Sequence, residues 1–394
     1  MTFQRKVVDR MDTQQYFSKT YQESRERFRG LLPQVKELWP DAALHTESIG
    51  NEEDLTIDFI YADARVSNDQ VMFMTTGEHG IEGYAGAAVV KMFVENHSHA
   101  VDADYTGLCL VHSINPWGMK HFRRVTGNNV DLNRNYIYKT EHVPEDLNTN
   151  YRDASRLFQP NGSLKEIPRE KTALYEYLTK GMAEQGYKAV KTAKGMGQYE
   201  FEKGVYYGGK EEERSASIMK SWQRKMLRNY SRVIHMDWHT ALGPTNEVTM
   251  VISDHQERDV DTLRNDYHME NVEKFSPSKV KGDSTNHFYE LQQHEFPDRR
   301  LLSALFEFGT FGTDREAELR EFTTIILENE LYWEGAEREE DRRWILQELR
   351  NMFYPVEQEW REAVLTEAEK VIVSVMKHEN MMKDASAVSS IRKA

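Results

Sequence analysis

The sequence predicts a single α/β domain built on a mixed, twisted sheet that is covered by helices on both faces. Apolar runs typical of buried strands alternate with amphipathic helical segments along most of the 394 residues, the pattern of sheets that carry helices on both faces. Hydrophobic residues make up 39% of the chain, enough to fill a core. Because no internal repeat or clear linker divides the sequence, we expect one domain over residues 1–394 with inserted loops.

The expected elements can be placed in chain order from hydrophobic periodicity. An aromatic stripe at helical spacing predicts an N-terminal helix over 13–40, and a second helix should follow Gly83. Apolar or alternating runs predict strands over 55–61, 71–76, 108–111, 232–238, 247–252 and 304–306. Residues 137–230 are interpreted as an insertion, with an irregular segment over 137–168 and a helix through 174–182. The region 314–394 is expected to be helical and highly charged.

Charge and composition indicate which classes of binding partner and which cellular compartment the protein can have. The formal net charge is −14 without any arginine-rich arm, so we expect neither nucleic acid nor a membrane surface as a partner. Cys109 is the single cysteine, which excludes an internal disulfide and fits a reducing compartment. No apolar run approaches the roughly 18 residues of a membrane span, and no signal peptide is evident. We therefore expect a cytoplasmic protein; the sequence does not indicate its oligomeric state.

Two short motifs predict a metal site. His79 and Glu82 stand three residues apart in a glycine-rich motif that directly follows an apolar strand. His239 lies at the end of another predicted strand, and strand C-termini line the crevice where such sheets bind ligands. Two histidines and a glutamate are a known ligand set for catalytic zinc. We predict one zinc ion per chain on these three residues, with His235 as an alternative third ligand because both histidines face the same side of a strand.

Two further segments end at the same edge of the predicted sheet. One contains Arg123 and Arg124 followed by Asn133 and Arg134. The other carries Glu307 inside an apolar strand, where a carboxylate is costly to bury unless it has a partner or a chemical task. These polar groups are therefore candidates for a site shared with the metal.

The order of these motifs resembles the zinc carboxypeptidase A-like metallopeptidase superfamily. The shared motifs are Gly-x-His-Gly-x-Glu, Asn-Pro-x-Gly, Arg-Arg, Val-Asp-Leu-Asn-Arg-Asn, Asp-x-His-Thr and Glu-Phe-Gly-Thr. The chain resembles most an uncharacterised bacterial branch, a domain of unknown function, through the segment Gly197–Gly209 with its Gly-Gln-Tyr and Tyr-Gly-Gly elements. The likeness extends from about Tyr16 to about Trp360 and implies a carboxypeptidase-like fold.

The resemblance also implies roles for the remaining residues. Arg124 would polarise the scissile carbonyl and hold the oxyanion, whereas the adjacent Arg123 is better explained as a positioning or surface residue. Asn133 and Arg134 would bind a terminal carboxylate, for which the planar guanidinium is well suited. Glu307 would act as the general base toward a water activated by zinc.

Together these features predict a zinc-dependent, metallocarboxypeptidase-like hydrolase. Its substrate would be a small peptide or an N-acyl amino acid with a free carboxylate, cleaved at an amide bond. An aspartoacylase-like N-acyl amino acid deacylase stays open, since Arg124, Asn133 and Arg134 fit either reaction. A zinc-binding protein without turnover is the alternative outside enzymes, although binding alone requires neither Glu307 nor Arg124. A serine hydrolase is disfavoured because no Gly-x-Ser-x-Gly elbow occurs.

Overall fold

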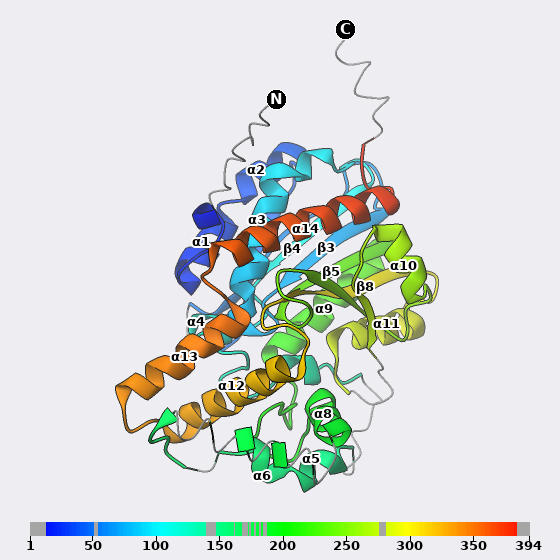
Figure 1. Cartoon of the computed structure of the whole chain (residues 1–394). Helices are drawn as coiled ribbons and strands as arrows, with labels where there is room; N and C mark the ends of the chain where they lie inside the picture. Colours follow the sequence, from blue (N-terminus) through cyan, green and yellow to red (C-terminus); the bar gives the residue numbers. More distant parts are fainter. Residues whose placement is uncertain are drawn as a thin grey trace, which may run out of the picture.

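The computed structural model describes residues 13–50, 54–138, 147–160, 162–167, 187–275 and 281–383, and scattered positions between 168 and 186. Eight strands form one mixed sheet in the order β1-β2-β4-β3-β5-β8-β6-β7. Helices cover the sheet on both faces (Figure 1). The predicted fold class is confirmed.

The middle of the sheet is parallel and the outer strands make it mixed. β4, β3, β5 and β8 run parallel to one another, β2 and β6 pair antiparallel on either side of them, β1 is antiparallel to β2, and β7 is parallel to β6. The strands are β1 (Ala43–Ser48), β2 (Thr56–Ala62), β3 (Gln70–Thr76), β4 (Thr106–His112), β5 (Arg232–Ala241), β6 (Val248–Ser253), β7 (Val272–Phe275) and β8 (Arg300–Gly309). Because β3, β4, β5 and β8 are parallel, their carboxyl ends meet at one edge.

Two apolar layers hold the helices on the sheet. On one face, a large core cluster joins the sheet to α1 (Tyr21–Arg29), α2 (Leu32–Leu38), α3 (Gly83–Asn96) and α14 (Gln358–His378). On the other face, a second cluster joins it to α9 (Arg214–Asn229) and α11 (Ser284–Glu295). In this second layer Trp222 stacks on Phe59 with ring centroids 4.0 Å apart. Burial on both faces explains why the central strands are almost continuously apolar.

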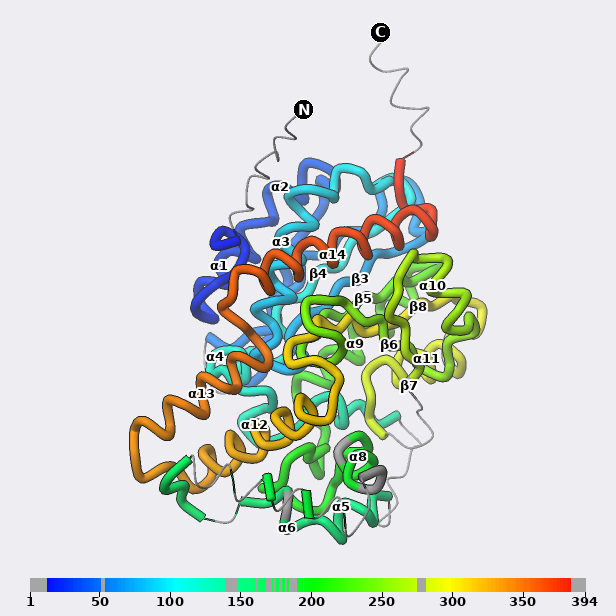
Figure 2. The backbone as a smooth tube through the Cα atoms, in the orientation of Figure 1, coloured from blue at the N-terminus to red at the C-terminus, as the bar shows by residue number. Residues whose placement is uncertain are grey.

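The remaining helices lie around this core. Figure 2 shows α5, α6 and α8 grouped at the end of the molecule away from both termini. The helices outside the two apolar layers are η1 (Thr13–Gln15), η2 (Gly80–Glu82), η3 (Ser98–Ala100), α4 (Pro116–Lys120), η4 (Leu132–Arg134), α5 (Thr149–Asp153), α6 (Ser155–Phe158), α8 (Tyr187–Met196), α10 (Val260–Tyr267), α12 (Arg315–Glu334) and α13 (Glu339–Phe353). No helix in the described ranges is long and apolar enough to span a membrane.

Several boundaries differ from the sequence prediction. The helix expected over 13–40 is three pieces, η1, α1 and α2, because Thr20 caps the start of α1 and Pro33 lies in the first turn of α2. β1 and β7 were not predicted; β1 is partly exposed and polar, and β7 has four residues. The segment 137–168 contains α5 and α6.

The structure describes parts of the segment predicted as an insertion and most of the C-terminal region. The helix expected through 174–182 lies largely outside the described residues. Within the insertion the structure also contains α8 and α9, which the sequence pattern did not predict. The helical C-terminal region is confirmed by α12, α13 and α14, and residues 384–394 lie outside the described part.

Candidate metal centre

Tight glycine turns bring the first motif onto the C-terminal edge of the sheet. β3 runs into a turn at Gly77, whose φ of 69° lies in the left-handed region that favours glycine. A side chain at Gly80 would clash with the backbone of Gly118. The turn leads into η2, so that His79 and Glu82 both lie in the crevice at the carboxyl ends of the strands.

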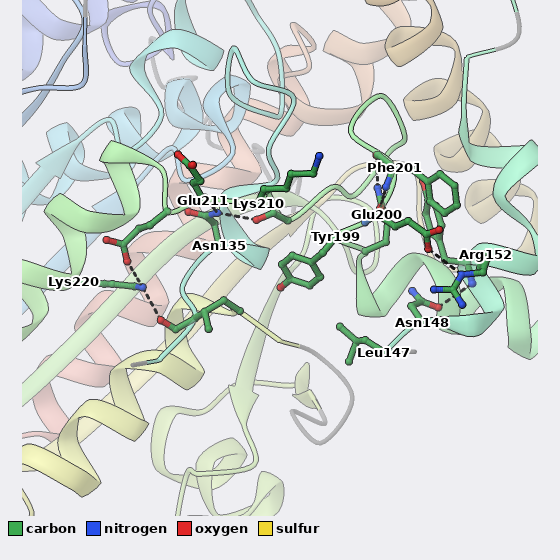
Figure 3. Close-up of a pocket in the computed structure, with 16 residues that line it drawn as sticks. Asn135, Leu147, Asn148, Arg152, Tyr199, Glu200, Phe201, Lys210, Glu211 and Lys220 are labelled. Atoms are coloured by element: carbon green, nitrogen blue, oxygen red, sulfur yellow. Dashed lines mark hydrogen bonds and ion pairs between the residues drawn. The ribbon is translucent and has the colours of Figure 1, made fainter. Parts of the chain in front are cut away.

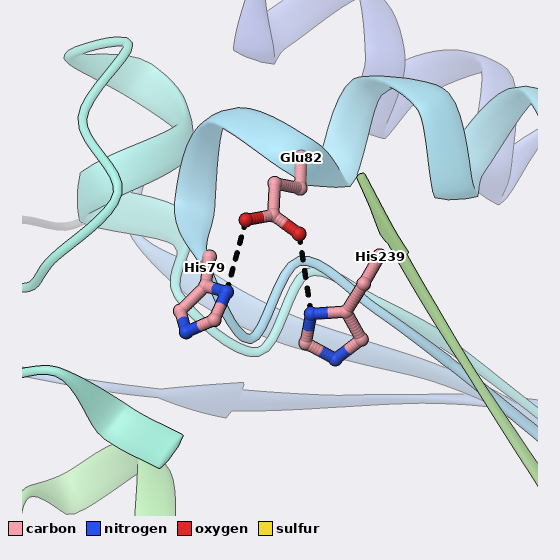
Figure 4. A group of neighbouring side chains, drawn as sticks. All are labelled: His79, Glu82 and His239. Carbon is pink, nitrogen blue, oxygen red and sulfur yellow. Dashed lines mark hydrogen bonds and ion pairs between the residues drawn. The ribbon is translucent and has the colours of Figure 1, made fainter. Parts of the chain in front are cut away.

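His79, Glu82 and His239 lie side by side, and the two imidazole rings face the Glu82 carboxylate between them (Figure 4). The Nδ1 atom of His79 is 2.9 Å from Oε1 of Glu82, and Nδ1 of His239 is 3.1 Å from Oε2 of the same carboxylate. The three ligand atoms lie within 4.8 Å of one another, and all three side chains are buried. Two imidazole nitrogens and one carboxylate oxygen in this arrangement fit a catalytic zinc ion.

Carboxylates behind the two imidazoles orient them. Asp131 Oδ1 is 3.2 Å from Nε2 of His79, and Asp237 Oδ2 is 3.0 Å from Nε2 of His239. Metal-binding histidines usually donate their second ring N–H to such an acceptor, which fixes the tautomer and leaves the other nitrogen free for the metal. The backbone N–H of Thr240 also donates to Glu82 at 2.9 Å. The donor set and its supporting contacts therefore fit zinc.

The centre strongly favours positive charge. Burial would raise the pKa of Glu82, but His79 and His239 hold it at about 2. Burial would likewise raise the pKa of Asp131, and Arg124 and His79 keep it well below its usual range. Glu82 and Asp131 are thus ionised at neutral pH, as a metal ligand and the carboxylate that orients a ligand histidine must be.

His235 lies away from this group. Its Nε2 atom is 2.9 Å from Thr75 Oγ1 and its Nδ1 atom is 2.8 Å from Ser303 Oγ. Burial lowers the pKa of His235 to about 4, with the charge of Asp237 acting in the opposite direction. Because both ring nitrogens are engaged within the sheet, the alternative of His235 as third ligand is disfavoured.

Glu307 lies on β8 directly opposite His239 in the parallel ladder between β5 and β8. The side chain is buried, and its Oε2 atom has no hydrogen-bond partner. Burial raises the pKa of Glu307 to about 8, with His239 opposing and Glu82 reinforcing the rise. A carboxyl group with this pKa can take up or release a proton near neutral pH.

The two neighbouring arginines have different positions. Arg124 donates through Nη1 to Asp131 at 2.7 Å, and its Nη2 atom is 2.7 Å from Nε2 of His79. Arg123 instead forms a buried pair with Glu328 through contacts of 2.5 and 3.2 Å. Arg124 is therefore the arginine at the centre, on the side of His79 that faces away from Glu82.

Asn133 and Arg134 lie in η4, and backbone groups occupy much of their bonding capacity. Asn133 Oδ1 accepts a hydrogen bond of 3.0 Å from the N–H of Ser284. Arg134 donates through Nη1 to the carbonyl of Asn133 at 2.5 Å and through Nη2 to that of Gly195 at 2.8 Å. The Nε atom of Arg134 is buried without a hydrogen-bond partner and is thus available to a ligand.

The segment Gly197–Gly209 covers this arginine. A Cβ atom at Gly197 (φ 68°) would lie 2.7 Å from Cδ of Arg134, and the hydroxyl of Tyr199 donates to the carbonyl of Arg134 at 2.6 Å. Arg124 lies 5.6 Å from the centre of the ring of Tyr206, whose hydroxyl is buried without a hydrogen-bond partner. The segment therefore forms a wall beside both arginines, a role that sequence patterns alone did not assign.

A pocket of about 660 Å³ lies next to this wall (Figure 3). Asn135 and Tyr199 line it, but none of His79, Glu82 and His239 does. Its charged residues are largely paired, as in Arg152 with Glu200 and Lys220 with Glu212. The pocket is separate from the candidate metal centre.

Other polar residues of the centre were missed from the sequence. Asp131 stands inside a recognised motif, and its aspartate before an asparagine–arginine pair could have indicated a support for a ligand. Glu78 was interpreted only as a variable position of the first motif, although a carboxylate directly before a ligand histidine is a detectable signal. Tyr136 had no such signal, because only the fold brings it to the centre.

The mixed sheet, with two histidines and a glutamate at its C-terminal edge, defines a class of α/β proteins whose strand ends could hold a metal ion. Within that class, the chain belongs to the family described as "Protein of unknown function (DUF2817)", which matches residues 17–367. This match confirms the resemblance to an uncharacterised branch. No curated protein was found to be similar to the chain.

Several solved structures are similar in fold at low sequence identity. Carboxypeptidase A from Helicoverpa armigera is 11% identical, with a TM-score of 0.49 over 91% of this chain and 73% of that one. Bovine thrombin-activatable fibrinolysis inhibitor, solved with a tick carboxypeptidase inhibitor, is 15% identical, with a TM-score of 0.41 over 92% and 100%. A metallo-carboxypeptidase from Burkholderia cenocepacia is 11% identical, with a TM-score of 0.41 over 90% and 69%.

Proposed function

We propose that this protein is a zinc-dependent hydrolase that cleaves an amide bond in a small peptide or an N-acyl amino acid with a free carboxylate. The observation that carries the proposal is Glu307, a buried carboxyl group with one unpartnered oxygen, directly opposite His239 of the candidate metal centre. Zinc held by His79, Glu82 and His239 would supply Lewis acidity, polarising the scissile carbonyl and lowering the pKa of water.

The protein's own groups would carry the proton and position the substrate. Glu307 would accept a proton from the attacking water and deliver it to the leaving amine, since its raised pKa suits both steps. Arg124 would stabilise the developing oxyanion after exchanging part of its contact with Asp131 for the substrate. Asn133 and the Nε atom of Arg134 would bind the free carboxylate.

A second candidate is an aspartoacylase-like deacylase of N-acyl amino acids. It is favoured by the cover that Gly197 and Tyr199 form over Arg134, whose Nη atoms already bond to backbone carbonyls. A covered, partly occupied carboxylate site suits a short acyl amino acid better than the end of a long peptide. Both candidates use the same metal, base and arginines, so the substrate distinguishes them.

Metal analysis followed by a substrate screen tests the proposal. We expect His79→Ala and Glu82→Ala to lose most of the zinc at this centre, because each removes one of three ligands. His235→Ala is the matched control and should keep it, since His235 bonds within the sheet. Full zinc occupancy in both ligand variants, measured by elemental analysis, would refute the assignment.

The screen should contain N-acyl amino acids and short peptides, each assayed with and without a chelator. Turnover that the chelator abolishes and zinc restores would support a zinc hydrolase. Preference for acyl amino acids over peptides would select the deacylase. Bound zinc with no turnover on either class would favour the third alternative, a zinc-binding protein without catalysis.

A further inference from the structure

A second group of buried ligand-type side chains lies on the far side of His239. In Figure 4 the Nε2 atom of His239 points away from Glu82. It lies 3.0 Å from Asp237 Oδ2 and 3.7 Å from Glu78 Oε2. The ligand atoms of Glu78, Asp237 and His239 lie within 4.8 Å of one another, and each of these residues is about 1% exposed. This group has the same compactness as the first centre.

Glu78 is the residue that the protein leaves unsatisfied. Both of its carboxylate oxygens are buried and have no hydrogen-bond partner. Buried polar groups in folded proteins are nearly always hydrogen-bonded, and an unpaired buried carboxylate is especially costly. Among the described residues, neither Glu78 nor Asp237 forms an ion pair with a lysine or arginine. The protein therefore supplies little positive charge here beyond the imidazole of His239.

The hydroxyl group of Tyr136 is buried beside the same two carboxylates. Burial raises the pKa of Tyr136, and the charges of Glu78 and Asp237 raise it further, as does the position of Glu78 as its side-chain neighbour. Oxygen atoms from three separate parts of the chain, those of Glu78, Tyr136 and Asp237, thus come together here.

We propose that Glu78, Asp237 and Nε2 of His239 form a second site for a divalent metal ion beside the zinc centre. Two carboxylates and one imidazole suit zinc or manganese. His239 would stand between the two ions, with Nδ1 toward the first and Nε2 toward the second. The second ion replaces the ring proton on Nε2, and this proton is released to solvent. The proposal depends on this geometry and not on the substrate of the enzyme.

A neutral Glu78 is the competing explanation. Protonation would remove its charge, and the hydroxyl of Tyr136 is close enough to Glu78 to serve as the acceptor for the acid proton. A metal ion would satisfy the carboxylate directly and would also engage Asp237. The two explanations differ in one measurable quantity, the number of ions that the chain binds.

The decisive variant is Glu78→Gln, which keeps the shape of a protonated glutamate but is a poor metal ligand. Metal-free protein would be titrated with zinc and, separately, with manganese, followed by removal of loose metal and elemental analysis. We expect about two zinc ions per chain in the unmodified protein and about one in Glu78→Gln. Glu82→Gln should lose the first ion while keeping the second, and the exposed Glu359→Gln should match the unmodified protein.

Two results would overturn the proposal. The first is an unmodified protein that binds about one zinc ion at every concentration tested, and the second is a Glu78→Gln variant with unchanged stoichiometry. If Glu78→Gln does not fold, anomalous diffraction from zinc-soaked crystals of the unmodified protein decides. A second peak between Glu78, Asp237 and Nε2 of His239 would support the site, and a single peak at the first centre would exclude it.

Discussion

At the scale of single residues, the surroundings of each side chain determine what it can do. Glu82 and Glu307 are both buried carboxyl groups near His239. The pKa of Glu82 is held at about 2 by two imidazoles, whereas burial raises that of Glu307 to about 8. One is therefore a permanent anion suited to bind a cation, and the other can carry a proton. Two carboxyl groups in one site thus have two roles, because their environments push their pKa values apart.

Replacement of Glu307 tests the proton carrier. Glu307→Gln should keep the fold and the zinc, because the amide is isosteric and Glu307 is not among the three ligands. Turnover should fall roughly a thousandfold or more, since the group that moves the proton is lost. The rate is to be measured on the best substrate of the screen, with zinc content measured on the same sample. A near-normal kcat would show that Glu307 has a structural role only.

A cycle that combines a mutation of Arg134 with a change in the substrate tests the carboxylate site. Its buried Nε atom lacks a partner, and a substrate carboxylate would supply one. Arg134→Ala should weaken binding of carboxylate substrates by about 1.5–3 kcal/mol, the usual contribution of a hydrogen bond to a charged group. Amidation or esterification of the substrate carboxylate should cost a similar amount with the unmodified enzyme.

The two losses should not add, because they remove the same contact from opposite sides. Kinetics on the four combinations of enzyme and substrate give this coupling directly. Fully additive losses would mean that Arg134 does not bind the carboxylate, and would favour a substrate without a free carboxylate at this position.

At the scale of elements, the strand ends and the covering segment define the site. β3 and β5 deliver the ligands because parallel strands end at one edge, and η2 turns His79 and Glu82 toward it. The segment Gly197–Gly209 then closes over Arg134, where glycine is required at position 197 by both its φ of 68° and its contact with the arginine. The position of this segment should therefore be sensitive to a single methyl group.

We expect Gly197→Ala to destabilise the protein by about 1–3 kcal/mol, the cost of a non-glycine residue in a strained left-handed conformation. The added Cβ would also lie 2.7 Å from Cδ of Arg134 and should raise KM for carboxylate substrates. Gly195→Ala is the matched control, because Gly195 lies in α8 and an added Cβ there would have no atom within 4 Å beyond its chain neighbours and the backbone of its own helix. Denaturant unfolding and steady-state kinetics measure both effects. The same unfolding free energy and the same KM in the two variants would refute the requirement for glycine at position 197.

At the scale of the whole molecule, buried histidines couple the fold to pH. His112 lies at the end of β4, and its Nε2 atom is 2.9 Å from Oγ of Ser24 in α1. His235 lies inside the sheet. Burial lowers the pKa of each from 6.5 to about 4. Both are therefore neutral in the folded protein at pH values where the unfolded chain already binds protons.

The contribution of these two histidines to the free energy of unfolding should consequently fall as the pH decreases from about 6.5 to about 4. Above pH 6.5 both states are neutral and the contribution is constant; below it the unfolded state alone gains protons. The full loss is at most about 3 kcal/mol per histidine. Urea unfolding of the metal-free protein at several pH values measures it. His235→Gln should flatten the profile, the exposed His99→Gln should not, and an unchanged slope in both variants would contradict this account.

The sequence by itself determined the fold class, the strands at the centre of the sheet and the candidate ligands His79 and Glu82, because apolar runs and glycine-flanked motifs are local patterns. It did not reveal β1 and β7, which are a half-exposed strand and a four-residue strand with weak periodicity. Only the tertiary structure decided which histidine of β5 reaches Glu82 and which arginine reaches Asp131. The same holds for the unpartnered carboxylate of Glu78 beside Tyr136. These outcomes depend on contacts between residues far apart in the chain. The burial of those residues then determines whether their side chains are charged.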